Sequence, residues 1–147
     1  MVRYIEYNNT YIDKVKDHIK TIILEEFDFK ELCQWYSEKD YEVYKKNGGN
    51  FWIVIDENNN IIGTIGLQDE GNDTFKLVGL YVKEEYRGTE ISTELFNIVK
   101  NYALNKKYTK IILGTYERMS RAINFYRKVG FKEYNRDEDA IFLVLDL

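Results

Sequence analysis

The chain has 147 residues, of which 44% are hydrophobic and 31% carry a charge, so we expect one globular domain over residues 1–147. The net charge of −4 disfavours a protein that wraps nucleic acid by neutralising phosphates. No apolar run is long enough to span a bilayer and no secretory leader is recognisable, so we expect a cytoplasmic protein without a membrane partner. The single cysteine, Cys33, favours a reducing compartment and is expected to be a small buried hydrophobe.

The first part of the chain predicts a strand and two helical segments. Val2–Tyr7 is apolar and β-branched, and the polar residues that follow it offer helix-capping side chains. A second, weaker helical region runs from about residue 29 to Lys46, where Gly48 and Gly49 break it. The first helix is predicted from the helical spacing of Ile12, Val15, Ile19, Ile22 and Ile23.

The middle of the chain predicts a meander of three strands. Phe51–Ile55 and Ile61–Leu67 are apolar runs on either side of an Asp- and Asn-rich hairpin turn. Thr74–Val82 forms the third strand after a second polar turn. Gly79 lies inside this third strand, where glycine often marks a bulge or the close approach of a ligand.

The remaining part predicts two helices and three strands. The order of elements over the whole chain is β-α-α-β-β-β-α-β-α-β-β, which is typical of an α/β fold with a mixed sheet and helices packed on its faces. The segments concerned are a helix from Ile91 to Tyr102, a strand at Lys110–Thr115, a helix at Ser120–Val129, and strands at Phe131–Tyr134 and Ala140–Asp146.

Two local features point to chemistry on a phosphorylated carrier. The strand that contains Leu80 ends in a turn around Gly88, which leads directly into an amphipathic helix. Such a turn leaves backbone N–H groups unpaired at a helix N-terminus, where they favour phosphate. Further along, Tyr126 lies on a short helix that Gly130 closes. The combination of an anion site and a positioned phenol suggests group transfer.

These features resemble the GNAT superfamily of acyl-CoA-dependent N-acyltransferases. Leu80–Ser92 matches most positions of its central motif, Leu-Tyr-Val-x-x-x-Tyr-Arg-Gly-x-Gly-Ile-Gly, and Ala122–Phe131 is similar to its second signature. The resemblance implies an α/β fold with a mixed, mostly antiparallel central sheet and helices on both faces. It also implies an N-acetyltransferase that moves an acetyl group from acetyl-CoA to a primary amine of a small molecule or protein, by direct attack in a ternary complex.

The resemblance assigns roles to individual residues. Tyr126 would protonate the departing thiolate as general acid, and backbone donors near the Gly79 bulge would stabilise the oxyanion. Arg87 has the alternative of pairing with Glu84 or Glu85, and Asn124 that of a plain surface residue. Coenzyme A would be held along the strand and at the helix start by Leu80, Tyr81, Val82, Arg87, Gly88, Thr89, Ile91, Ser92, Thr93 and Asn124.

The chain departs from the family pattern in two ways. Glu90 replaces a glycine, so either its carboxylate turns outward as a helix N-terminal acid or it weakens coenzyme A binding. The strand that precedes the motif carries no carboxylate, which leaves Asp69, Glu70, Glu117 or a water relay as candidates for the general base. Both departures keep open an alternative: a non-catalytic acyl-CoA-binding or interaction domain with the same fold.

Three further expectations concern the acceptor, metals and partners. Aromatic residues with nearby acids are interpreted either as a pocket for a cationic amine or as ordinary core packing. His18, the only histidine, is expected at the surface, and a lone histidine disfavours a zinc site, so no metal is expected. An apolar edge on the last strands suggests a possible homodimer. The aromatic residues are Phe27, Phe29, Trp35, Tyr36, Tyr41 and Tyr44, with Glu25, Glu26 and Asp28 nearby.

Overall fold

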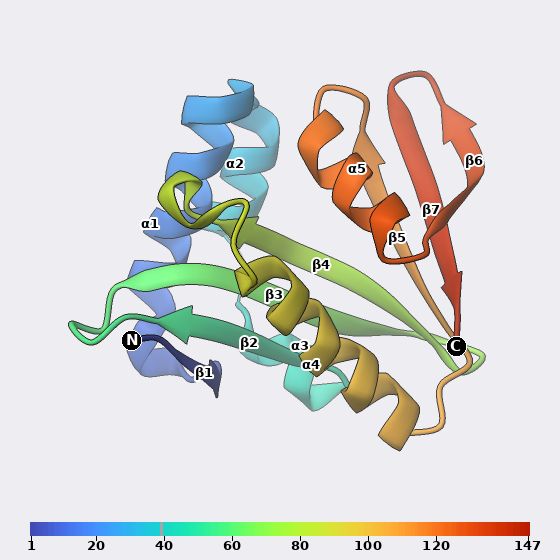
Figure 1. Ribbon diagram of the computed structural model, residues 1–147, viewed down its shortest axis with the longest axis horizontal. Coiled ribbons are helices and arrows are strands. Elements are labelled where there is room, and N and C mark those ends of the chain that lie inside the picture. The colour runs from blue at the N-terminus through green and yellow to red at the C-terminus, as the bar shows by residue number, and fades with distance from the viewer. Residues whose placement is uncertain (39) are drawn as a thin grey trace.

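A seven-stranded sheet organises the chain, for which the computed structural model describes residues 1–38 and 40–147 (Figure 1). The strand order is β1-β2-β3-β4-β5-β7-β6, and every neighbouring pair is antiparallel except β4 and β5. The expected mixed, mostly antiparallel sheet is therefore confirmed. The strands are β1 (Arg3–Glu6), β2 (Asn50–Ile55), β3 (Ile61–Gly71), β4 (Thr74–Val82), β5 (Lys110–Tyr116), β6 (Lys132–Asp137) and β7 (Ala140–Asp146).

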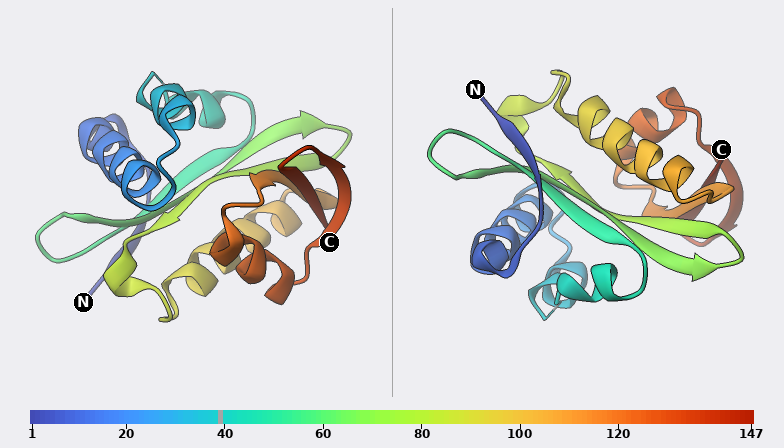
Figure 2. Two further views of the ribbon diagram at one scale, coloured as in Figure 1. Left: turned by 90° about the horizontal axis from the view of Figure 1, so that it is seen from above. Right: turned by 90° about the horizontal axis from the view of Figure 1, so that it is seen from below.

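Helices cover both faces of the sheet (Figure 2). One face carries α1 (Ile12–Ile22), α2 (Lys30–Ser37) and α3 (Glu42–Lys46), and the other carries α4 (Ile91–Asn105) and α5 (Ser120–Lys128). Within the described ranges, no helix is both long and apolar enough to cross a bilayer. Three single-turn elements join these helices and strands: η1 (Asn9–Tyr11), η2 (Ile23–Phe27) and η3 (Glu84–Tyr86).

The core has two parts because the sheet is covered on both sides. Trp52 and Val54 of β2 belong to the cluster beneath α4 and α5, whereas Phe51, Ile53 and Ile55 belong to the cluster beneath α1 to α3. Side chains alternate between the faces of a strand, so a strand buried on both faces reads as a continuous apolar run. The sequence of β2 is therefore recognised by its run of apolar residues, because apolar and polar residues do not alternate along it.

The helical part of the first half differs from the expectation in detail. The Asn8 side chain accepts a hydrogen bond from the backbone N–H of Thr10 at 3.0 Å, as expected of a capping residue. Beyond Ile22 the helix widens into the π-helical turn η2, which ends at Asp28 in the left-handed conformation (φ 47°). The weaker helical region expected from residue 29 to Lys46 is divided into α2 and α3. A single π-turn leaves little trace in apolar spacing, so the sequence did not reveal it.

The sheet opens between β4 and β5. These two strands pair in parallel only at Thr74–Lys76 with Lys110–Ile112, and beyond that point they diverge (Figure 1). The β3–β4 register shifts between Thr64 and Gly66, opposite Gly79. Gly79 has a φ of 64°, and a Cβ there would lie 3.1 Å from the Phe51 ring, so glycine is required. The bulge indicated by this glycine therefore exists, and it lies where the sheet opens.

Candidate active site

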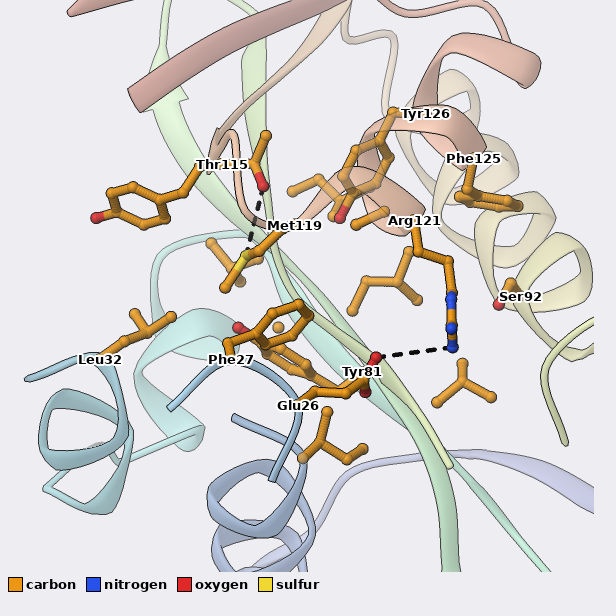
Figure 3. A pocket seen from close by; sticks show the side chains of 18 of the residues that line it. Glu26, Phe27, Leu32, Tyr81, Ser92, Thr115, Met119, Arg121, Phe125 and Tyr126 are labelled. Carbon is orange, nitrogen blue, oxygen red and sulfur yellow. Dashed lines mark hydrogen bonds and ion pairs between the residues drawn. The ribbon is translucent and has the colours of Figure 1, made fainter. Parts of the chain in front are cut away.

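A cavity of about 760 Å³ opens where β4 and β5 diverge (Figure 3). Its walls come from η2 and α2 on one side, β4 at the base, and the start of α4 together with α5 on the other side. The cavity therefore brings together segments that are far apart in the sequence. Both motifs identified from the sequence contribute to its lining.

The turn before α4 has the features of an anion site. Gly88 has a φ of 75°, and a Cβ built there would have no atom within 4 Å, so the backbone is open to a close ligand. The Glu90 side chain makes no cap hydrogen bond to α4, and the Ile91 amide donates to Thr89 Oγ1 at 3.4 Å. The Thr89 hydroxyl donates to the Tyr86 carbonyl, which braces the turn. The dipole and amide groups of the first turn of α4 therefore face an accessible surface that favours negative charge.

The residues predicted to hold coenzyme A lie in three environments. Ile91 is 5% exposed and packs in the core beneath α4, where its side chain faces the sheet. Asn124 lies on the exposed side of α5 and does not line the cavity, and Glu90 is likewise exposed and outside the lining. The cavity is lined by the other members of the set, Leu80, Tyr81, Val82, Arg87, Gly88, Thr89, Ser92 and Thr93.

Tyr126 projects from α5 into the cavity (Figure 3). It is 6% exposed, and its ring is held between Phe125 and Phe131 at centroid distances of 6.0 and 5.7 Å. Burial raises the pKa of the Tyr126 phenol well above its ordinary value of 10.0, and the nearby Tyr36 adds to this effect. The phenol is therefore protonated at neutral pH and is able to donate a proton.

Arg87 is held by partners that the sequence did not indicate. Its Nε donates to the Val82 carbonyl at 3.0 Å, and its guanidinium pairs with Glu26 of η2 rather than with Glu84 or Glu85. Glu26 also lies 3.7 Å from Arg121 of α5. Within the described residues, Arg87 Nη1 is buried and has no hydrogen-bond partner. A buried cationic donor without a partner, next to the turn at Gly88, fits a phosphate oxygen.

The aromatic segment between α1 and β2 is divided between the cavity and the core. Phe27, Phe29, Trp35 and Tyr36 line the cavity. Tyr41 and Tyr44 are buried in the cluster beneath α1 to α3, which is the core packing that the sequence offered as the alternative to an acceptor pocket. Of the three acids named with this segment, Glu26 lines the cavity, whereas Glu25 and Asp28 do not. The packing of this segment against the sheet turns part of its aromatic residues inward, which composition alone does not distinguish.

The carboxylates considered as general bases lie elsewhere. Asp69 accepts a hydrogen bond from the Tyr108 hydroxyl at 2.9 Å near the far end of β3, and Glu70 is exposed beside it. Glu117 pairs with Arg136. None of the three lines the cavity. The acids that do line it include Glu26 and Glu31.

His18 is buried, so its expected surface placement was wrong. It is 6% exposed on the inner side of α1, and its Nε2 lies 2.9 Å from the Tyr81 carbonyl oxygen. Burial lowers the pKa of His18 to about 4, partly offset by the bond to Tyr81. The imidazole is therefore neutral and supports β4 from behind. Cys33 is buried, as expected.

Comparison with known proteins agrees with this architecture. Residues 17–131 match the sequence model of the acetyltransferase (GNAT) family. N-alpha-acetyltransferase 30 of Schizosaccharomyces pombe is 26% identical over 140 residues, which cover 92% of this chain and 87% of that protein. N-acetylaspartate synthetase of Danio rerio is 28% identical over 103 residues, and this match covers 68% of the chain but only 36% of that longer protein.

Solved structures show the same fold. A GNAT-family acetyltransferase of Staphylococcus aureus Mu50 has a TM-score of 0.91 and 29% identity, covering 100% of this chain and 99% of that one. A protein of Bacillus anthracis, solved with acetyl coenzyme A, has a TM-score of 0.67 and 26% identity, covering 74% of this chain and 70% of that one. The resemblance drawn from two motifs is thereby confirmed. The chain belongs to the acetyltransferase (GNAT) family and is a GNAT-type N-acetyltransferase.

Proposed function

We propose that this chain transfers the acetyl group of acetyl-CoA to a primary amine of a small molecule or protein, by direct attack within a ternary complex. The observation that carries this proposal is that one cavity joins the anion site at the start of α4 to the Tyr126 phenol. The 26% identical protein of Bacillus anthracis was solved with acetyl coenzyme A, which supports the same donor here.

The proposed binding of coenzyme A uses the backbone of two elements. The diphosphate accepts hydrogen bonds from the amides between Arg87 and Thr93 and from Arg87 Nη1. Since β4 pairs with β5 only up to Lys76, the backbone of Leu80–Val82 has an open edge. The pantetheine arm, which carries amide groups, pairs with that edge as an added strand would. This arrangement leads the thioester toward Gly79 and Tyr126.

The proposed transfer requires one acid and a neutral amine. The amine lone pair attacks the thioester carbonyl carbon, a C–N bond forms, and the C–S bond breaks as the carbonyl is restored. The departing thiolate takes the phenolic proton of Tyr126, and the proton released by the amine passes to water in the cavity. Asp69, Glu70 and Glu117 lie outside the cavity, so the scheme uses a water relay or an amine that arrives deprotonated in their place. It assigns no proton transfer to Glu26 or Glu31, which line the cavity.

The proposed acceptor enters beside the aromatic wall. Phe27, Phe29 and Trp35 provide apolar surface next to the thioester position. Arg118 already lies over the Phe29 ring, 4.5 Å from its centroid, so this ring is able to hold a cation on its face. Such a wall suits an amine attached to an apolar or cationic group.

A thiol-release assay with acetyl-CoA and a panel of amines tests this function. We expect release above the solvent background, and a decrease in kcat of about 10²–10⁴-fold in Tyr126→Phe, because a general acid contributes that much. Coenzyme A affinity, measured by calorimetry, should stay unchanged in this variant. Tyr134→Phe, which alters an exposed phenol, is the matched control. Binding of acetyl-CoA without release from any amine would overturn the proposal.

A further inference from the structure

Lys76 of β4 places a positive charge on the cavity wall, at the end away from the anion site. Its neighbour Phe75 packs in the cluster beneath α4 and α5, so alternation along the strand turns Lys76 toward the face that carries α1 to α3. Lys76 is partly buried there and lines the cavity. It pairs in register with Ile112, the last residue of β5 that pairs with β4. Lys76 therefore lies where the opening between the two strands begins.

The ammonium group of Lys76 has no partner in the described part of the chain. The hydrogen bonds and ion pairs among those residues include none with its side chain. Two acids lie on adjoining surfaces: Glu70 of β3 lines a second groove, and Glu31 is exposed on the α2 wall of the cavity. Neither of them forms an ion pair with Lys76. A cation that is partly withdrawn from water loses hydration, and an anion that enters the cavity is able to replace it.

The position of Lys76 along β4 separates it from the phosphates of coenzyme A. A strand advances about 3.3 Å per residue, so Lys76 lies roughly 20 Å from Val82, beyond which the turn at Gly88 begins. The thioester is proposed to reach Gly79, which by the same measure lies about 10 Å from Lys76. Lys76 therefore lies past the reacting carbonyl, in the part of the cavity that is left to the acceptor.

The surface beside Lys76 is apolar and leaves room for a ligand. Gly114 of β5 lies on the same face, lines the cavity and has no side chain to fill it. The Phe142 ring lies beside this glycine, 3.3 Å from where a Cβ would be. Tyr116, the next residue of β5 on this face, meets Phe29 edge to face with centroids 4.9 Å apart. These rings join the aromatic wall proposed for the acceptor to the surface that ends at Lys76.

We propose that Lys76 determines acceptor specificity by binding a carboxylate of the acceptor, which is then an amine with an apolar body and a carboxylate several bonds from the nitrogen. The inference rests on the proposed function. Of the apolar and cationic bodies that suit the aromatic wall, it selects the apolar one. In this arrangement the amine lies at Gly79, the body lies against the rings, and the carboxylate lies at Lys76. The Lys76 ammonium keeps its protons and orients the acceptor.

Pairs of amines that differ only in charge test this inference. The acids are para-(aminomethyl)benzoate and ε-aminohexanoate, and their partners are the primary amides with the same bodies. Calorimetry measures their affinities for the protein saturated with coenzyme A, a complex that cannot react. We expect each acid to bind at least about tenfold more tightly than its amide, because a hydrogen bond between charged groups is worth that much. The kcat/KM values with acetyl-CoA should show the same preference.

Two substitutions assign the preference to Lys76. Lys76→Gln removes the charge, so we expect it to bind the acids as weakly as the amides while its affinity for the amides stays unchanged. Lys76→Glu should bind the amides more tightly than the acids. Lys110→Gln is the matched control, because it removes one positive charge from an exposed position of β5 outside the cavity lining and should keep the preference. Circular dichroism verifies that each variant is folded.

The binding and transfer experiments separate this inference from the proposed function. Equal affinities of acids and amides in the wild type, no measurable binding of either, or a preference that survives in Lys76→Gln overturns the role of Lys76. Thiol release from amines would still support the proposed function in each of these cases. A preference that disappears in Lys76→Gln, without thiol release from any amine, contradicts the proposed function and leaves the carboxylate site established.

Discussion

Arg87 and Glu26 form an ion pair across the cavity, between the turn that precedes α4 and the π-helical turn after α1. Their side chains are 17% and 27% exposed, so solvent screens the pair less than it would at an open surface. Glu26 also lies within ion-pair distance of Arg121 (Figure 3). The Glu26 carboxylate therefore occupies the position of an anion beside Arg87, where the diphosphate of coenzyme A is proposed to bind.

Glu26→Gln should tighten coenzyme A binding. The substitution removes a negative charge next to the diphosphate position and releases Arg87 from a competing partner. A partly exposed ion pair contributes about 0.2–1 kcal/mol, so we expect the dissociation constant to fall by about 1.4- to fivefold. Isothermal titration calorimetry at low and high salt measures this change, and the gain should shrink at high salt because both interactions are screened.

Glu57→Gln is the control for this measurement. It makes the same change in net charge in the exposed β2–β3 turn, far from the cavity, and should leave the affinity unchanged. If Glu26→Gln instead bound coenzyme A more weakly, Glu26 would orient Arg87 for the ligand. Competition between the Glu26 carboxylate and the diphosphate for Arg87 would then be contradicted.

Glu90→Gly should leave coenzyme A affinity within about twofold of the wild type, because Glu90 is exposed and outside the cavity lining. Of the two outcomes that the sequence left open, this position favours the outward one, in which the carboxylate complements the dipole of α4.

Gly88→Ala is the contrasting variant. Its φ of 75° disfavours a residue with a Cβ by roughly 1–2 kcal/mol, and the added methyl group would lie beside the proposed diphosphate position, so we expect at least about tenfold weaker binding. Equal affinities for the two variants would contradict this assignment.

Features encoded by local spacing were recoverable from the sequence. Gly79 and Gly88 each indicated a special backbone position, and each adopts a positive φ at the bulge and at the turn before α4. The apolar stripe of α4 and the continuous apolar runs of β2 and β3 likewise indicated the order of the elements. In each case, the signal and the structure that it indicates lie within a few residues of each other.

Features that depend on distant segments were not recoverable. For Arg87 the sequence offered phosphate or an acid of its own turn as the partner, but Glu26, with which it pairs, is 61 residues away. His18 was expected at the surface, because the sequence does not show that β4 supplies a carbonyl for its Nε2. Tyr36 appeared only as one of many aromatic residues, and its edge-to-face contact with the Tyr81 ring requires α2 to pack against β4. These contacts form the site, so composition and motif alone describe it incompletely.

Thr64→Val should destabilise the protein, because the buried Thr64 hydroxyl donates to the Gly79 carbonyl at 2.7 Å. Valine has nearly the same shape but leaves that carbonyl without its partner, which costs about 1–3 kcal/mol. Urea unfolding monitored by circular dichroism measures the change. Thr109→Val removes an exposed hydroxyl that bonds a carbonyl at 3.3 Å, and it should cost less than about 0.5 kcal/mol. Equal losses in the two variants would mean that the bulge does not depend on Thr64.

His18 should make the stability of the protein depend on pH between about 6.5 and 4. Burial lowers the pKa of the folded imidazole to about 4, while the bond to Tyr81 acts in the opposite direction and Lys83 lowers it further. As the pH falls below 6.5, the unfolded chain binds a proton at His18 that the folded chain does not bind, so stability is lost. The loss is complete once the pH is below the folded value, and it reaches about 3 kcal/mol.

His18→Gln isolates this contribution, because glutamine keeps an N–H donor for the Tyr81 carbonyl but does not titrate. Calorimetric melting from pH 7 to pH 4 should show a steeper decline for the wild type than for the variant, since the carboxylates titrate in both. The chain has a single histidine, so its imidazole resonances are directly assignable by NMR. A midpoint near 6.5 in the folded protein would contradict the burial of this side chain, and parallel melting curves would do the same.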